Sequence, residues 1–215
     1  MCIRDSYYMQ HYENLFKNKK WSCNKILEIG IGGFEDSNTK SSLHIWKYYF
    51  PFSNIYGIDI YDKSQLNCNR IKTFKGSQSD TRFLKYMIDE VGNFDIIIDD
   101  GSHKNHDVIT SFKFLFEYLN LGGYYIIEDS QTSYWKKFGG NSDLNTRATT
   151  TMNFFKSLAD GINHKEFLIP GYKATYFDLN ITMISFYHNL IVIKKELNNE
   201  PSNCVINNEK LVLKR

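Results

Sequence analysis

The stretch FDIIIDDGSHKNHD, residues 94–107, shows most directly how this chain folds. Its first half is apolar at consecutive positions, which is typical of a strand buried on both faces of a parallel sheet. Its second half carries acids, glycine and two histidines three residues apart. Ligands of open α/β sheets bind beyond the carboxyl ends of the strands. The stretch therefore predicts a central strand at 94–99 with a functional site at its end.

The same alternation of buried strand and amphipathic helix runs through the chain. Strands are predicted at 26–31, 54–60, 70–75, 94–99 and 124–128. Helices are predicted after Ser41 or Ser42, after an Asp80 N-cap, from Val108 to Leu119 with a stop at Gly122 and Gly123, and over 150–160. Residues 181–187 and 190–196 flank His188-Asn189 and predict a hairpin. The fold class is therefore α/β, a Rossmann-like doubly wound sheet that is mostly parallel and has a C-terminal antiparallel hairpin. This arrangement resembles that of class I S-adenosylmethionine-dependent methyltransferases.

Length and composition predict one domain over residues 1–215. We expect residues 1–9 to be artefactual or disordered and residues 198–215 to form a polar tail. Lys and Arg are scattered among the acids, with a net charge of +2, so nucleic acid is not an expected partner. No apolar run is long enough to predict a membrane span. The four cysteines form no CxxC pair, and no targeting segment is visible, so we expect a cytoplasmic protein.

A glycine turn, LEIGIGG at 27–33, closes the first strand and predicts nucleoside binding. The third glycine of the dinucleotide fingerprint is missing, which disfavours NAD. Asp59 ends the next strand, where a carboxylate can accept hydrogen bonds from ribose hydroxyls. The alternative is that the glycines only make a tight turn and that Asp59 only caps a loop. The predicted cofactor contacts here are Glu28, Gly30, Gly32, Gly33, Asp59, Ser77 and Gln78.

Acidic pairs end two strands that should be neighbours, Asp99-Asp100 and Glu128-Asp129. Crowded carboxylates repel one another unless a cation lies among them, and an oxygen-only set suits Mg²⁺. We expect Asp100, Glu128 and Asp129 to be metal ligands, and Asp99 to face the methionine amine of the cofactor. Each acid alone is more often a loop cap or an ion-pair partner.

His103 follows the first acidic pair and is the candidate general base, because neutral imidazole accepts protons near pH 7. His106 lies one turn further on and is a candidate for the surroundings of the site. Tyr134 and Trp135 either stack on a sugar ring of the substrate or pack over the sheet.

Four segments, LEIGIGG, YGIDIYDKS, IIIDDGSH and IIEDSQTSYW, together resemble the metal-dependent sugar O-methyltransferases of the macrocin and mycinamicin type. The resemblance implies S-adenosyl-L-methionine and Mg²⁺ as cofactors, a macrolide-type glycoside as substrate in antibiotic biosynthesis, and a homo-oligomer. It also implies metal ligands at Asp100, Glu128 and Asp129 and a base at His103. Surface glycans are alternative acceptors.

Three other functions stay open at this point. Catechol-like phenols also offer a vicinal diol to a metal-dependent methyltransferase. A nucleotide-binding oxidoreductase is disfavoured by the missing glycine. A non-catalytic nucleoside-binding partner subunit is disfavoured by the full set of carboxylates.

Overall fold

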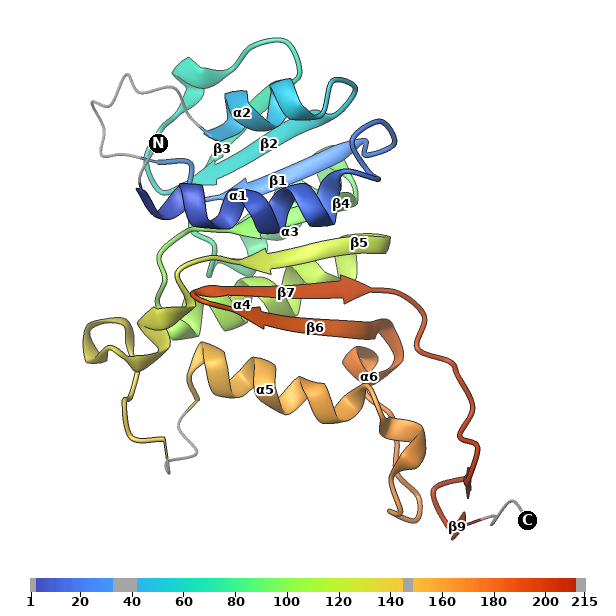
Figure 1. The fold of residues 1–215 in the computed structure, drawn as a ribbon. Helices are drawn as coiled ribbons and strands as arrows, with labels where there is room; N and C mark the ends of the chain where they lie inside the picture. Colours follow the sequence, from blue (N-terminus) through green and yellow to red (C-terminus); the bar gives the residue numbers. More distant parts are fainter. Residues whose placement is uncertain (1–2, 33–41, 145–148, 212–215) are drawn as a thin grey trace.

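The computed structural model describes residues 3–32, 42–144 and 149–211, and these form one α/β unit around a seven-stranded sheet (Figure 1). The strand order is β3-β2-β1-β4-β5-β7-β6. β1 to β5 pair in parallel, whereas β7 is antiparallel to both β5 and β6. The predicted fold class, including the C-terminal antiparallel hairpin, is therefore confirmed.

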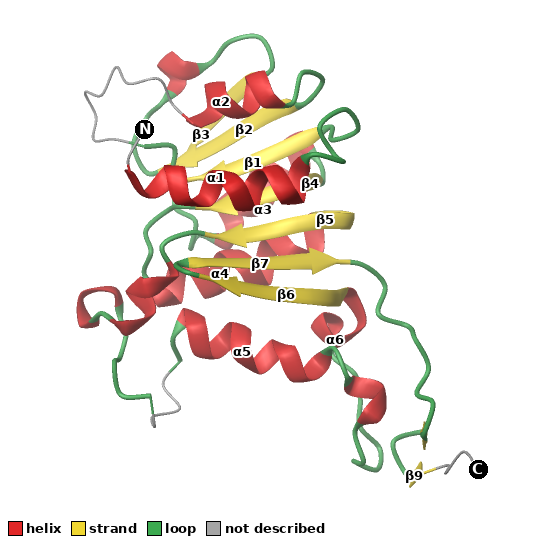
Figure 2. Cartoon of the chain, in the orientation of Figure 1, coloured by secondary structure: helices red, strands yellow, loops and turns green. Residues whose placement is uncertain are grey.

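The elements follow one another largely as the sequence pattern predicts (Figure 2). The strands are β1 Lys25–Ile29, β2 Asn54–Asp59, β3 Ile71–Lys75, β4 Phe94–Asp99, β5 Leu119–Ile127, β6 Ile181–Tyr187 and β7 Leu190–Lys195, with a small pair β8 Val205–Ile206 and β9 Lys210–Leu211. The α-helices are α1 Ile3–Phe16, α2 Ser42–Tyr49, α3 Thr81–Val91, α4 Asn105–Leu115, α5 Thr151–Gly161 and α6 Tyr176–Asn180.

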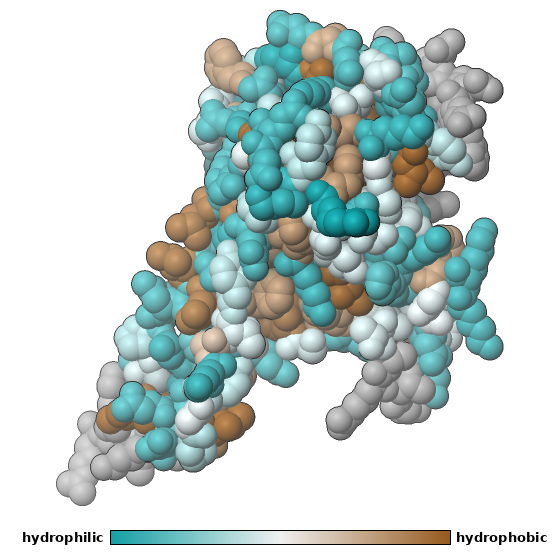
Figure 3. All heavy atoms as spheres, turned by 180° about the vertical axis from the view of Figure 1, so that it is seen from behind, coloured by the Kyte–Doolittle hydropathy of each residue, from teal (hydrophilic) through white to brown (hydrophobic). Residues whose placement is uncertain are grey.

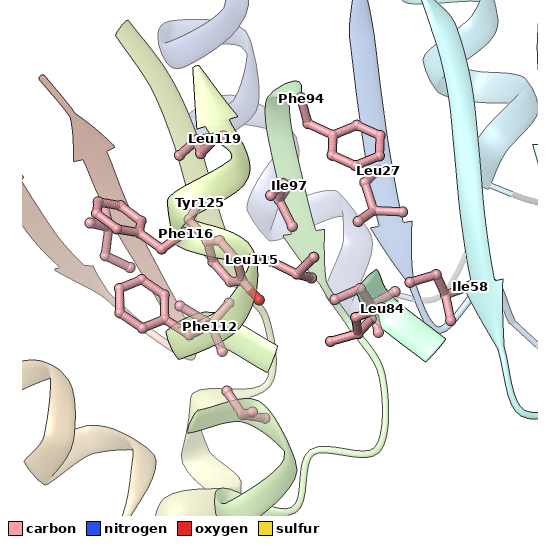
Figure 4. Packing of buried hydrophobic residues seen from close by; sticks show 14 of the residues in the cluster. Leu27, Ile58, Leu84, Phe94, Ile97, Phe112, Leu115, Phe116, Leu119 and Tyr125 are labelled. Carbon is pink, nitrogen blue, oxygen red and sulfur yellow. The ribbon is translucent and has the colours of Figure 1, made fainter. Parts of the chain in front are cut away.

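Two apolar clusters cover the two faces of the sheet. Alternating residues of β4 face opposite sides, so Ile97 packs in one cluster and Ile96 and Ile98 in the other. The first cluster lies under α3, α4 and α5 and contains Phe112 (Figure 4). The second lies under α1 and α2 and contains Trp46. A sheet covered on both faces leaves its strand ends as the place for a polar site.

The link from α4 to β5 differs from the prediction. The helix over Val108–Leu119 was expected to stop at Gly122 and Gly123, but α4 ends at Leu115, and β5 already begins at Leu119 and runs through both glycines. A Cβ on Gly123 would lie 2.8 Å from the Asp95 carbonyl oxygen, and the register against β4 shifts at this point. Gly123 therefore permits close strand contact at a bulge, and neither glycine ends a helix.

Part of the N-terminal stretch 1–9, which is expected to be artefactual or disordered, belongs to helix α1, which begins at Ile3. Tyr8, Tyr12 and Phe16 are buried against the sheet at intervals of four residues, so they share one face of the helix. The expected polar tail begins at Asn198, whose side chain donates to the Ile162 and Asp178 carbonyls and is therefore tied to the domain.

The surface seen from behind is mostly hydrophilic, with smaller groups of apolar side chains (Figure 3). Helices of the described residues are all too short or too polar to cross a bilayer.

Candidate active site

The first feature of the site is the glycine turn after β1, which brings the end of this strand against the end of β4. Gly30 has a φ of +80°, and its N–H donates to the Ile58 carbonyl at 2.8 Å. A Cβ at Gly30 would lie 2.3 Å from the Asp100 carbonyl oxygen. Gly32 also has positive φ, but a Cβ there would meet no atom of the described residues within 4 Å. The two glycines thus differ in their surroundings: Gly30 permits close strand contact, whereas Gly32 is not crowded by any described part of the chain.

A cavity of about 530 Å³ lies beyond the carboxyl ends of β1, β2 and β4. The predicted nucleoside contacts Gly30, Gly32, Asp59, Ser77 and Gln78 line it. Gly33, also predicted, lies outside the described residues. Five of the seven predicted nucleoside contacts therefore surround one cavity of a size suited to a small ligand.

Asp59 has a position compatible with both interpretations given to it. One of its oxygens, Oδ1, accepts a hydrogen bond from the Tyr61 N–H at 2.9 Å, which is a local loop cap. The residue also lines the cavity at the end of β2.

Glu28 differs from the other predicted cofactor contacts. It is buried, and its carboxylate accepts hydrogen bonds from the Ser42 hydroxyl and from Trp46 Nε1, the latter at 3.0 Å. It is not among the described residues that line the cavity. Its place under α2 favours a role in attaching that helix to β1.

Asp99 also lies elsewhere than predicted, because it shares the strand face of Ile97 and points toward α4. Its side chain is 1% exposed and accepts hydrogen bonds from Gln78 Nε2 at 3.0 Å and from the Ser111 hydroxyl at 2.8 Å. Burial raises the pKa of Asp99 to about 6, against the lowering effect of these hydrogen bonds. This position does not favour the predicted contact between Asp99 and the methionine amine.

Gln78 is consequently a link between two loops as well as a lining residue. While its Nε2 binds Asp99, its Oε1 accepts the Ser102 N–H at 2.7 Å. The loop after β3 is therefore attached to the loop that carries His103.

A second part of the site is a group of ionisable side chains at the ends of β4 and β5. His103 Nε2 lies 3.9 Å from Asp100 Oδ1 and 3.8 Å from Asp129 Oδ2. The ligand atoms of these three residues all lie within 4.8 Å of one another. His103 and Asp129 have positive φ, 56° and 50°, an uncommon conformation for residues other than glycine that often marks functional sites.

The electrostatics of this group fit a cation. The pKa of Asp100 is raised well above its ordinary value, chiefly by burial and then by the negative charges of Glu128, Glu28 and Asp129. Such crowding is unfavourable for carboxylates alone and is relieved by a positive charge among them. Carboxylate oxygens are the donors that Mg²⁺ prefers. The residues present therefore fit the predicted divalent cation.

The structure adds two residues that the sequence analysis missed, Tyr8 and Tyr12 of α1. The Tyr12 hydroxyl donates to Glu128 Oε1, and the Tyr8 hydroxyl lies 3.3 Å from Asp129 Oδ1. Their spacing of four residues was the available signal, but the helix was not predicted.

The other predicted residues lie further out. His106 is exposed and pairs with its neighbour Asp107 at 3.3 Å, away from the carboxylate group. Tyr134 is half-buried, and Trp135 is 49% exposed; neither is among the described lining residues of the cavity. The Trp135 ring lies 6.0 Å from the Phe138 ring, which is in turn 6.4 Å from the His103 ring. Aromatic side chains thus extend outward from His103.

Comparison with known proteins agrees with this geometry. The chain is 41% identical over 196 residues to mycinamicin VI 2''-O-methyltransferase of Micromonospora griseorubida, an alignment that covers 90% of this chain. It is 40% identical over 198 residues to demethylmacrocin O-methyltransferase of Streptomyces fradiae. The chain is a homologue of the macrocin and mycinamicin sugar O-methyltransferases. The resemblance predicted from the motifs is therefore confirmed, although no protein-family model matches the chain.

Solved structures of these sugar O-methyltransferases share the fold. A structure of MycE methyltransferase from the mycinamycin biosynthetic pathway, in complex with Mg and SAH, has a TM-score of 0.86 and 40% identity. Another, in complex with Mg, SAH and mycinamycin VI, has a TM-score of 0.85. Each alignment covers 91% of this chain and about half of the solved chain, 51% and 50%. The chain likewise spans about half the length of the sugar O-methyltransferases whose sequences it matches.

Proposed function

We propose that this chain catalyses methyl transfer from S-adenosylmethionine to a hydroxyl group of a sugar or glycoside, with Mg²⁺ bound at the ends of β4 and β5. The observation that carries the proposal is the group formed by Asp100, His103 and Asp129 beside the cavity. Support comes from the relatives, whose names describe O-methylation of mycinamicin VI and of a rhamnosyl tetracenomycin.

The methyl donor has a suitable place in the cavity. Gly32 lets the backbone approach a ligand closely, Gly30 lines the same cavity, and Asp59 lies where ribose hydroxyls can donate to it. The solved relative that contains SAH supports this assignment.

The cation would be held by Asp100, Glu128 and Asp129. When bound there, Mg²⁺ would supply a positive charge that lowers the pKa of an acceptor hydroxyl beside it and offsets the charge of the crowded carboxylates. Tyr12 and Tyr8 hold two of these carboxylates from α1.

His103 would act as the general base at Nε2. The acceptor oxygen attacks the methyl carbon as its proton passes to Nε2; an O–CH₃ bond forms, the S–CH₃ bond breaks, and the sulfonium becomes a neutral thioether. Asp100 and Asp129 face Nε2 at 3.9 and 3.8 Å, so they stabilise the imidazolium that results. Each turnover then releases this proton to solvent.

The acceptor would lie on the outer side of His103. Trp135 and Phe138 offer ring faces there, and a sugar ring can pack against an aromatic face. Trp135 remains our proposed substrate contact on this ground, and Tyr134 remains a proposal from the sequence as its neighbour.

The test compares His103→Gln with His106→Gln, which removes an exposed imidazole of the same loop region. With methyl glycosides as acceptors and labelled S-adenosylmethionine as donor, we expect kcat of His103→Gln to fall by roughly 10²–10⁴. His106→Gln should stay within about twofold of wild type. Mg²⁺ affinity, measured by calorimetry, should be kept in both variants.

Two results would contradict the proposal. Unchanged kcat in His103→Gln would exclude His103 as the base, and loss of Mg²⁺ affinity would make it a metal ligand instead. Faster methylation of catechol than of any glycoside would assign the site to phenols.

A further inference from the structure

Helix α1 lies over the sheet beside β1 and β4, with its buried face toward the strands (Figure 1). Tyr8 and Tyr12 are 4% and 5% exposed, so both rings belong to the core on this side. Their hydroxyl groups, however, point at the carboxylates that end β5. Two polar groups one helical turn apart therefore meet two consecutive acidic residues of the site.

The contacts of Tyr12 are the better defined. Its hydroxyl donates to Glu128 Oε1. The ring itself is fixed by packing, stacked on Phe16 with centroids 5.4 Å apart and edge-on to Trp46 at 5.3 Å. A donor on a rigid ring sets the direction of the carboxylate that it binds.

The contact of Tyr8 divides the two oxygens of Asp129 between different partners. Oδ1 lies 3.3 Å from the Tyr8 hydroxyl, whereas Oδ2 lies 3.8 Å from His103 Nε2. Asp129 thus turns Oδ2 toward His103 and the site, and Oδ1 toward α1. The same Tyr8 hydroxyl also lies 3.3 Å from the Asn189 carbonyl oxygen of the β6–β7 hairpin.

We infer that Tyr12 and Tyr8 are positioning residues for the divalent cation: their hydroxyl groups orient Glu128 and Asp129 so that one oxygen of each is directed at the ion. The inference rests on the proposed function, because it presumes that a cation binds there. Hydrogen bonds to ligating carboxylates orient them, and loss of such a partner typically weakens metal affinity about 10–100-fold.

The two tyrosine hydroxyl groups should differ in how much each contributes to metal affinity. A tyrosine hydroxyl has one proton to donate. The Tyr8 proton is shared between two acceptors at 3.3 Å, whereas the Tyr12 hydroxyl donates to Glu128. We therefore expect loss of the Tyr12 hydroxyl to weaken metal affinity more than loss of the Tyr8 hydroxyl.

The chain offers a matched control in Tyr49 of α2. Its hydroxyl also donates to a carboxylate, Glu13 Oε2 at 2.7 Å, but this pair lies on the exposed surface. Tyr→Phe substitution at 8, 12 and 49 removes one hydroxyl and keeps the ring in each variant. A purely structural role would alter the melting temperature and leave metal affinity unchanged.

The experiment measures the Kd for Mn²⁺ by electron paramagnetic resonance of the free ion, and the Kd for Mg²⁺ by competition. We expect Tyr12→Phe to raise both values about 10–100-fold, Tyr8→Phe to raise them less, and Tyr49→Phe to leave them within about twofold of wild type. Thermal unfolding followed by circular dichroism identifies the folded variants. If Tyr12→Phe does not fold, the comparison of Tyr8→Phe with Tyr49→Phe tests the inference.

The outcomes separate the inference from the function on which it rests. If wild type binds neither ion, the proposed metal site is wrong, and the inference fails with it. If wild type binds both ions and the folded Phe variants at 8 and 12 bind them as the Tyr49→Phe control does, only the positioning role is overturned.

Discussion

Substitution of Gly30 by alanine tests whether the first and fourth strands must meet at the site. The residue has a φ of +80°, and an added Cβ would lie 2.3 Å from the Asp100 carbonyl oxygen and 2.6 Å from Gly101 Cα. Both neighbours are backbone atoms of the loop that carries His103, so no side chain can rotate away. The strands must separate or the loop must shift.

The magnitude follows from a comparison with Gly32→Ala. Gly32 has a similar φ of +82°, but its added Cβ comes within 4 Å of no atom in the part of the chain that the structure describes. In both variants, an alanine in the left-handed conformation therefore lowers the free energy of unfolding by about 1 kcal/mol. Only Gly30→Ala adds steric overlap, which we place at about 3 kcal/mol, the upper end for overpacking, because backbone must move.

The assay is urea unfolding of wild type and both variants, with Mg²⁺ affinity measured in parallel. We expect Gly30→Ala to be about 3 kcal/mol less stable than Gly32→Ala, equivalent to a melting temperature lower by roughly 6–12 °C. Its Mg²⁺ affinity should also fall, because Asp100 moves with its backbone. Equal stability of the two alanine variants would refute the close approach of the strands.

Three further predictions concern parts of the fold away from the glycine turn. Asp80→Ala should cost about 1 kcal/mol of unfolding free energy in urea, since Asp80 caps α3 by accepting two backbone N–H groups; no change would mean that the cap is not used. Asn105→Ala should cost about 2–4 kcal/mol, because Asn105 Nδ2 donates to the Phe138 carbonyl at 2.8 Å and its Oδ1 accepts a backbone N–H at 2.6 Å; a loss below 1 kcal/mol would contradict this. Burial lowers the pKa of Lys195 to about 8 from 10.5, so the unfolded chain binds more protons between these values, and stability should rise with pH. Between pH 7 and 9.5, the free energy of unfolding in urea should rise by roughly 2 kcal/mol more for wild type than for Lys195→Met. The same pH dependence in both proteins would contradict the burial of this amine.

Most of the fold could be predicted because the sheet is buried on both faces. Strands such as Phe94–Asp99 are continuous apolar runs, and helices such as α3 begin at a recognisable cap. The errors arose where tertiary contact decides the structure. Gly122 and Gly123 were interpreted as a helix stop, but both lie inside β5, and Gly123 admits the neighbouring strand β4, which local sequence does not reveal.

The candidate site was predicted at the level of strand ends, and less well at the level of side-chain direction. Asp99 and Asp100 are adjacent, so they lie on opposite sides of the strand, and only Asp100 reaches the cavity. The sequence alone could not show that Glu28 has a different role from the glycines beside it. That role depends on Trp46, eighteen positions further on, which donates a hydrogen bond to its carboxylate. Tyr12 was missed because nothing near it in sequence indicates its distant partner, Glu128.

The most direct test of the central claim is calorimetric titration of Mg²⁺ into wild type and Asp100→Asn, each saturated with S-adenosylhomocysteine. We expect both proteins to bind S-adenosylhomocysteine, wild type to bind one Mg²⁺, and Asp100→Asn to bind Mg²⁺ at least tenfold more weakly. Equal Mg²⁺ affinity in the two proteins would contradict the claim that the carboxylates at the ends of β4 and β5 form the metal site.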